Sequence, residues 1–186
     1  MLIVSISALL IAFMAAALSL AVALRVKKIL DPLVELGLMK HPPSPALGRQ
    51  LPAVDGLLDR DGRSLALDAP RTDSWFLVFV STGCSGCAAQ LPDFERLLTD
   101  HRVPVERVVA VILGSGDEAD AYQEKVSRFS RVVGDQESVA EITAALGVQA
   151  FPTFMHVNAD ARVEFSSSSV SLFREAVGAK LSSIPG

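Results

Sequence analysis

The feature that most constrains the fold is a series of short apolar runs separated by segments of helical periodicity. Residues 75–80 read Trp-Phe-Leu-Val-Phe-Val. A run of strand length without polar side chains is typical of a central strand covered on both faces. Residues 105–113, mostly apolar, predict a second buried strand, and residues 131–133 predict a short third strand. Parallel neighbours need crossover helices between them, so this order predicts an α/β fold with a parallel core.

Helical periodicity fills the intervals between these strands. The first predicted helix begins at a pair of cysteines, and its apolar positions share one face: Leu91, Phe94, Leu97 and Leu98. The next two predicted helices cover residues 117–129 and 137–146. Gly147 is placed to end the latter, because glycine adopts the left-handed conformation of a helix C-cap without strain.

Two hairpins and a helix flank this core. We predict an N-terminal β-hairpin extension over residues 53–67, with its turn at residues 59–62. Residues 153–157 and 163–167 predict a second hairpin, which adds antiparallel strands at the sheet edge. An amphipathic helix over residues 169–184 completes the predicted fold.

Residues 1–24 predict an uncleaved transmembrane anchor. They contain no charged side chain, proline or glycine, and a bilayer core needs about 20 apolar residues in helical form. The alternatives are a signal peptide cleaved after Ala23 and a buried core helix without a polar face. Arg25, Lys27 and Lys28 follow the run directly, and by the positive-inside rule they favour a cytoplasmic location for the rest of the chain.

Two segments lead from this anchor to a domain predicted at residues 53–186. Residues 25–39 have apolar positions at helical spacing and predict a juxtamembrane amphipathic helix. It would lie on the membrane surface, pack on a partner, or continue the anchor as a solvated helix. Residues 40–52 contain four prolines and predict a semi-rigid, extended linker.

Charge and cysteine content narrow the classes of function. The net charge is −4, so the chain lacks the basic field that gathers phosphates, and nucleic-acid binding is excluded. The chain has two cysteines, Cys84 and Cys87, which are too few and too close together for a disulfide-stabilised secreted fold. We therefore interpret the pair as reactive thiols.

The position of the pair suits thiol–disulfide exchange. Residues 81–83 end the first strand, and Cys84 then opens a helix, where free N–H groups and the helix dipole stabilise a thiolate. Cys87 follows about one turn later, within reach of a mixed disulfide on Cys84. Cys84 is thus the predicted nucleophile and Cys87 the resolving thiol. The expected partner is a protein thiol or disulfide, and no cofactor is needed beyond the Cys84–Cys87 disulfide itself.

Metal binding and a scaffold role are the alternatives. A zinc site needs four ligands, and His41, His101 and His156 do not stand at ligand spacing with the cysteines, so no metal site is predicted. Copper(I) delivery would use both cysteines with His156 or Met155. A non-catalytic scaffold subunit would hold its partners through the helix at residues 25–39.

These motifs together resemble the thioredoxin-fold superfamily. The resemblance rests on the apolar strand, the C-x-x-C that opens a helix, Pro92 within that helix, and Phe151-Pro152-Thr153 before the second hairpin. It covers roughly residues 51–184 and implies a three-layer sandwich. It also implies that Pro152 is a cis-proline that faces and shields the cysteines, and that Phe151 presents its backbone to an extended substrate.

Within the superfamily, the anchor and the leading hairpin resemble the membrane-tethered TlpA/ResA-like branch. Residues 37–39 (Gly-Leu-Met) and 79–81 (Phe-Val-Ser) resemble the methylamine-utilisation accessory proteins. This resemblance implies a role in forming or isomerising disulfides of a partner during enzyme maturation, with a redox partner in the membrane. It also implies an extracytoplasmic domain, where disulfides persist, against the charges that follow the anchor.

Three positions depart from the family pattern. Gly83 replaces the tryptophan that usually precedes the first cysteine, Val78 replaces the buried acid of thioredoxin, and Gln90 replaces a glutamate of several tethered reductases. Cys87 therefore lacks an obvious carboxylate for proton transfer, and we expect water, Thr82 or Ser85 to serve instead. The residues between the cysteines do not indicate the redox direction.

Overall fold

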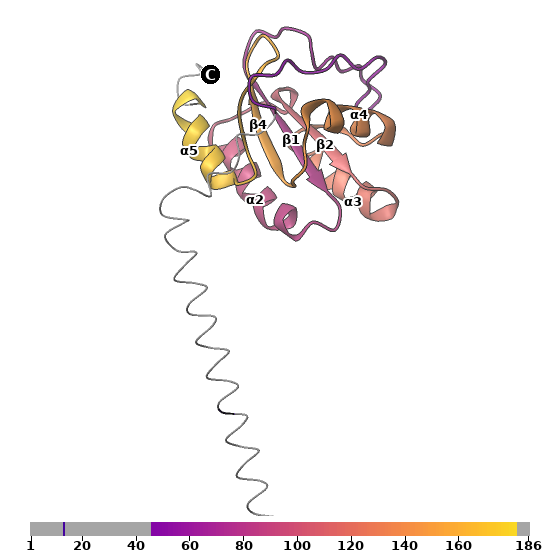
Figure 1. Cartoon of the computed structure of the whole chain (residues 1–186), viewed down its shortest axis with the longest axis vertical. Helices are drawn as coiled ribbons and strands as arrows, with labels where there is room; N and C mark the ends of the chain where they lie inside the picture. Colours follow the sequence, from indigo (N-terminus) through magenta and orange to yellow (C-terminus); the bar gives the residue numbers. More distant parts are fainter. Residues whose placement is uncertain (1–12, 14–45, 182–186) are drawn as a thin grey trace, which may run out of the picture. The chain divides into compact units, whose positions relative to one another are not determined.

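The structure is a computed structural model that describes residue 13 and residues 46–181 (Figure 1). The predicted anchor (apart from Phe13), the juxtamembrane helix at 25–39 and the first part of the linker lie outside the described residues. Among the described residues, no helix is both long and apolar enough to cross a membrane.

Five strands form one mixed sheet in the order β3-β2-β1-β4-β5. The parallel part consists of β1 (Trp75–Ser81), β2 (Val108–Leu113) and β3 (Arg131–Val133). The antiparallel part is the hairpin of β4 (Thr153–Val157) and β5 (Val163–Ser167). The structure confirms both the parallel core and the antiparallel edge predicted from the sequence.

The helices lie on both faces of this sheet, as Figure 1 shows. They are α2 (Ser85–Asp100), α3 (Asp117–Val126), α4 (Gln136–Leu146) and α5 (Val170–Leu181), with a 3-10 turn, η1 (Val105–Arg107), before β2. The faces are separated by the alternation of side chains along β1: Phe76, Val78 and Val80 belong to one buried cluster, and Leu77 and Phe79 belong to the other. A three-layer arrangement follows.

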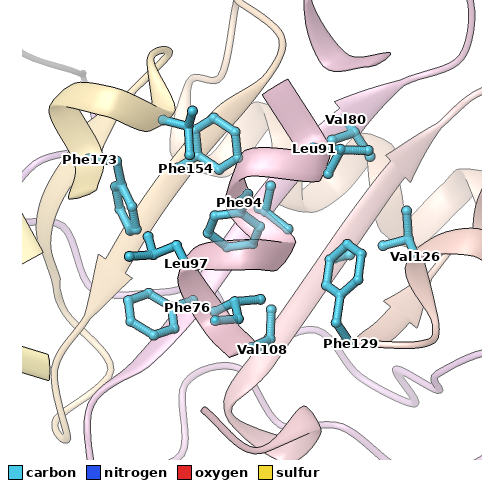
Figure 2. Close-up of a cluster of buried hydrophobic side chains, with 14 of the residues drawn as sticks. Phe76, Val80, Leu91, Phe94, Leu97, Val108, Val126, Phe129, Phe154 and Phe173 are labelled. Carbon is cyan, nitrogen blue, oxygen red and sulfur yellow. The ribbon is translucent and has the colours of Figure 1, made fainter. Parts of the chain in front are cut away.

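The first cluster holds α2, α3 and α5 against the sheet, and aromatic rings dominate it (Figure 2). The ring of Phe94 lies 4.8 Å from that of Phe154 and 6.1 Å from that of Phe173, between centroids. All four apolar positions that we predicted for α2 are buried. Burial of this face fixes α2, and with it the start of the helix at the cysteines.

The second cluster packs α4 and the N-terminal segment against the other face. Val139, Ile142 and Leu146 of α4 are buried there, and Gly147 ends the helix in the left-handed conformation, as predicted. The buried residues of the N-terminal segment are Ala46, Leu51, Leu57, Leu65 and Leu67.

The predicted N-terminal hairpin forms only around its turn, without regular strands. Residues 53–67 contain a single β-bridge, between Leu58 and Ser64, although the turn forms as predicted and the Gly62 N–H donates to Asp59 O at 2.9 Å. The Asp59 N–H donates to Arg63 O at 2.9 Å and the Leu65 N–H donates to Leu57 O at 3.0 Å, so pairing is limited to the residues beside the turn. Leu57, Leu65 and Leu67 are buried in the core, whereas Leu58 is exposed. The turn is also bonded to β3, because the Arg60 N–H donates to Val132 O at 2.8 Å.

The last part of the predicted linker packs on the domain. The Gly48 N–H donates to Val163 O at 2.8 Å, and the Leu51 N–H donates to Ala161 O at 2.9 Å. Gln50 forms a β-bridge with Arg162. Residues 46–51 are therefore part of the compact structure at the start of β5.

Two predicted elements are shorter than the sequence pattern suggested. The strand expected from residue 105 begins at Val108, because residues 105–107 form η1 and the Arg107 side chain binds Ser74 O. The helix expected to reach residue 129 ends at Val126, where the Ser130 hydroxyl donates to Val126 O at 2.9 Å. A side-chain hydrogen bond of this kind competes with the next helical turn.

Candidate active site at the start of α2

Cys84 is the N-cap residue of α2. Its backbone is extended, with φ −85° and ψ 105°, and its sulfur accepts a hydrogen bond from the Cys87 N–H at 3.1 Å. A cap side chain is directed at the unpaired N–H groups of the first turn, and the positive end of the helix dipole favours an anion there. The half-buried Cys84 sulfur is thus placed where a thiolate is stabilised and can still be reached.

Cys87 is fully buried beside it. The two sulfur atoms lie 2.6 Å apart, and both residues are free cysteines in this structure. Burial raises the pKa of the Cys87 thiol to about 12, and the hydrogen bond with Cys84 contributes to the rise. The pair therefore combines an accessible sulfur with a protected one that holds its proton at neutral pH.

The Phe151–Pro152 peptide bond is cis, as the resemblance implies. The Phe151 carbonyl oxygen lies 3.5 Å from the Cys84 sulfur. A Cβ placed on Gly86 would meet Pro152 Cδ at 3.7 Å, so the proline ring lies over the first turn of α2. The structure thus brings all four of these residues, Phe151, Pro152, Cys84 and Cys87, together at one end of the sheet.

Gly83 turns the chain from β1 into α2. Its φ is +71°, a conformation that favours glycine, and a Cβ added there would meet nothing within 4 Å. The usual tryptophan is therefore absent at a position where the space around a side chain is open.

The three supporting residues predicted from the sequence have different surroundings. The side chain of Thr82 packs against Gly114, whose φ is +144° and where any side chain would collide with the threonine. Ser85 is exposed in the first turn of α2, and Pro92 is exposed within the helix. Among the described residues, no hydrogen bond joins the Thr82 or Ser85 hydroxyl to a cysteine sulfur.

Val78 and Gln90, which stand where related proteins carry a carboxylate, cannot transfer the proton of Cys87. Val78 is buried in the first core cluster. Gln90 uses both ends of its amide: its nitrogen donates to Ser168 O at 3.2 Å, and its oxygen accepts from the Val170 N–H at 2.8 Å. Gln90 therefore ties α2 to the connection between β5 and α5.

The alternative copper ligands do not gather at the cysteines. His156 pairs with Phe76 near the start of β1, whereas the cysteines follow the end of that strand. Met155 belongs to the core cluster on the opposite face from Cys87. Within the described part of the chain, no group of three or more histidine, cysteine, aspartate or glutamate residues could hold a metal ion.

One residue near the site escaped the sequence analysis. Tyr122, on α3, packs against the core cluster that contains Cys87, and its hydroxyl is buried. From the sequence we predicted only that its segment, residues 117–129, is helical. The sequence feature that indicates its burial is its spacing from Val126: residues four apart lie on the same side of a helix, here the apolar side.

Comparison with known proteins identifies the fold. No protein-family model matches the chain. A tryparedoxin of Trypanosoma brucei brucei is 26% identical over 116 residues, which cover 61% of this chain and 80% of the relative.

Two solved structures show the same architecture. The thioredoxin domain of a thiol-disulfide oxidoreductase from Bacteroides vulgatus matches with a TM-score of 0.57 at 14% identity, covering 73% of this chain and 98% of that one. A thio-disulfide isomerase from Thermus thermophilus matches with a TM-score of 0.57 at 20% identity, covering 72% and 95%. The described domain thus has the thioredoxin fold.

Proposed function

We propose that this chain is a thiol–disulfide oxidoreductase that exchanges the Cys84–Cys87 dithiol and disulfide with protein substrates. The observation that carries the proposal is the geometry at the start of α2. An accessible sulfur caps the helix, and a buried sulfur lies 2.6 Å away. The relatives named as a tryparedoxin, an oxidoreductase and an isomerase support the same chemistry.

In the reductive direction, the Cys84 thiolate attacks one sulfur of a substrate disulfide. A bond forms between Cys84 and that sulfur, and the other substrate sulfur leaves with the electron pair as a thiolate. Cys87 then loses its proton to solvent and attacks the Cys84 sulfur. The Cys84–Cys87 disulfide forms, the second substrate thiolate leaves, and two electrons have passed to the substrate. The oxidative direction is the reverse sequence.

Phe151 and Pro152 border the position of the attacked sulfur. The Phe151 carbonyl oxygen, 3.5 Å from the Cys84 sulfur, can accept a hydrogen bond from the backbone of an extended substrate segment. The open space at Gly83 leaves room for a polypeptide rather than only a small thiol. A protein substrate is therefore favoured.

The first test is the redox equilibrium of the full chain against a series of glutathione ratios, read by alkylation of free thiols. We expect a reversible two-electron transition in the wild type and none in Cys84→Ser. The midpoint would also give the redox direction. Cysteines that stay reduced across the series would contradict the proposal. They would favour copper(I) delivery or a scaffold role as the function.

A second test separates the two cysteines. Cys87→Ser should accumulate a mixed disulfide between Cys84 and a disulfide-containing protein, because the resolving thiol is missing. Cys84→Ser should accumulate none, since the remaining thiol is buried. Non-reducing electrophoresis distinguishes these outcomes, and equal trapping by both variants would contradict the assigned roles.

The proposed setting is the outer face of a cell membrane, with residues 1–24 as a single-pass anchor and a redox partner in the membrane. The uncharged N-terminal run supports the anchor, and the persistence of disulfides outside the cytoplasm supports the orientation. The corresponding role is maturation of exported or membrane-bound proteins. A reporter that is active only outside the cytoplasm, fused after Gly186, should be active; an inactive but well-expressed fusion would refute this orientation.

A further inference from the structure

Tyr122 is the single tyrosine of the chain, and its hydroxyl group has an unusual environment. The oxygen is buried, and within the described part of the chain it has no hydrogen-bond partner. A buried polar group without a partner costs free energy, of the order of 1–3 kcal/mol, and native proteins retain few of them. We therefore looked for a state of the protein in which the Tyr122 hydroxyl makes a hydrogen bond.

The arrangement of α2 and α3 brings Tyr122 against the core cluster that contains Cys87. Both helices begin beyond the carboxyl ends of neighbouring parallel strands, β1 and β2, and both pack on the same face of the sheet. Leu91 and Val126 belong to the same core cluster, and Figure 2 shows Val126 on the side of α2 from which Leu91 projects. Cys87 lies one turn before Leu91, and Tyr122 lies one turn before Val126. Both residues therefore lie before the labelled pair along their helices, toward the ends that follow the strands, and both contact the same core cluster.

Electrostatics agree with this placement. Burial raises the pKa of Tyr122 to about 12, and the negative charges of Cys87 and then Cys84 add to the rise. The phenol is thus within electrostatic range of the pair, although it makes no hydrogen bond to either sulfur in this structure, and it keeps its proton as a donor at neutral pH.

The chemistry of Cys87 requires such a donor. Its thiol is buried, and each exchange passes through a Cys87 thiolate, either as the attacking group or as the leaving group. Val78 offers no carboxylate, and the amide of Gln90 is occupied by Ser168 and Val170. The Tyr122 hydroxyl is the neighbouring donor that the fold leaves unused.

We propose that the Tyr122 hydroxyl donates a hydrogen bond to the Cys87 thiolate during exchange. The proposal rests on the oxidoreductase function proposed above. When Cys87 attacks the mixed disulfide, its proton passes to solvent and the phenol O–H stabilises the resulting charge. When Cys87 leaves the Cys84–Cys87 disulfide, the same O–H stabilises the electron pair that it receives. Tyr122 keeps its own proton throughout.

The test uses 5,5′-dithiobis(2-nitrobenzoate), a small disulfide whose released thiolate absorbs visible light. Attack by Cys84 releases one nitrobenzoate thiolate and leaves the other bound to Cys84. Attack by Cys87 then releases the second and closes the protein disulfide. Stopped-flow absorbance on the full, reduced chain separates the two releases and measures each as a function of pH.

In Tyr122→Phe we expect an unchanged first release and a second release about three- to ten-fold slower at neutral pH. A hydrogen bond to a charged group shifts its pKa by about one to two units, and roughly half of that gain is offset because a less basic thiolate is a weaker nucleophile. The pH profile of the second release should also move to higher pH.

Stability supplies an independent readout. Because the variant removes an unpaired hydroxyl and keeps the ring, its free energy of unfolding should equal or exceed that of the wild type. Ser130→Ala is the matched control, since it removes another buried hydroxyl at the edge of the same cluster, one bonded to Val126 O. Both of its releases should match those of the wild type.

The outcomes separate the two proposals. A wild-type chain without a rapid first release would refute the oxidoreductase function itself. A normal first release, together with a second release and a pH profile that Tyr122→Phe leaves unchanged, would refute the role of Tyr122 alone. Loss of stability in Tyr122→Phe with both releases slowed equally would assign the residue a packing role and likewise overturn the proposal.

Discussion

Asp59 is a buried carboxylate at the contact between the N-terminal segment and β3. Its side chain is 3% exposed, and it accepts hydrogen bonds from Arg131 Nε at 2.8 Å and from the Arg63 N–H at 2.8 Å. Burial alone would raise the pKa of this carboxyl, but the bonds from Arg131 and the Arg63 backbone outweigh it and lower the pKa below 3.8. The folded protein therefore binds this proton less readily than the unfolded chain does.

The lowered pKa of Asp59 determines how its contribution to folding stability depends on pH. The contribution of Asp59 is fully present above its unfolded pKa, near pH 4, and is lost as the pH falls through the lower folded value. Asp59→Asn should cost about 3 kcal/mol at pH 7, because it leaves Arg131 largely buried without its counter-charge, and should weaken the dependence of stability on acid. Urea unfolding at pH 7 and pH 3 measures both effects.

Asp61→Asn is the matched control for this prediction. Asp61 also pairs with an arginine, Arg63, but both side chains are more than half exposed. Its loss should change stability by less than about 1 kcal/mol. If Asp59→Asn behaved like this control, the buried pair would not hold the segment to β3.

At the scale of residues, the sequence predicted the groups that carry local motifs. Cys84 and Cys87 were found from their spacing and from the elements around them, and the Phe151–Pro152 step was found from the resemblance to the thioredoxin-fold superfamily. Asp59 was assigned only to a turn, because its partner Arg131 is 72 residues away along the chain. Tyr122 was missed for the same reason: its environment depends on how α3 packs beside α2.

At the scale of elements, the link between α2 and α5 depends on an amide at position 90. Gln90 both donates to Ser168 O and accepts from the Val170 N–H. A carboxylate can only accept, so in Gln90→Glu the Ser168 carbonyl would face a negative oxygen. We expect a loss of about 1–2 kcal/mol at pH 7. Denaturant unfolding measures it.

Acid should partly rescue this variant. A protonated glutamic acid has one donor and one acceptor, like the amide, so the stability difference between Gln90→Glu and wild type should narrow near pH 4. Gln90→Met, which loses both hydrogen bonds at every pH, should show no such rescue. A constant difference for Gln90→Glu across this range would refute the proposed bonding.

The elements were predictable where burial and periodicity agree. The strands of the sheet have continuous apolar sequences, and the bounds of β4 and β5 match the predicted ones. The N-terminal hairpin forms only beside its turn. Leu57, Leu65 and Leu67 are buried in the core and the turn is bonded to β3, and neither feature is visible in a local pattern. Likewise, the hydroxyl of Ser130 bonds at the end of α3 and shortens that helix.

At the scale of the molecule, the sequence placed the domain boundary too late for the fold to be complete. A fragment that begins at Ala53 lacks the buried side chains of Ala46 and Leu51 and the bonds from residues 48–51 to the start of β5. Relative to a fragment from Ser44, where the compact unit begins, it should lose about 3 kcal/mol or more. Urea unfolding of both fragments measures this difference, and equal midpoints would contradict it.

The N-terminal segment has a consequence for the edges of the sheet. It occupies backbone groups at both edges of the sheet: Val163 bonds to residues 48 and 49, and Val132 bonds to Arg60. Exposed strand edges recruit extended chains and seed aggregation. These bonds occupy Val163 on β5 and Val132 on β3, so part of each edge is closed to pairing with another chain. The end of the sheet where Phe151 faces Cys84 is not covered by these bonds.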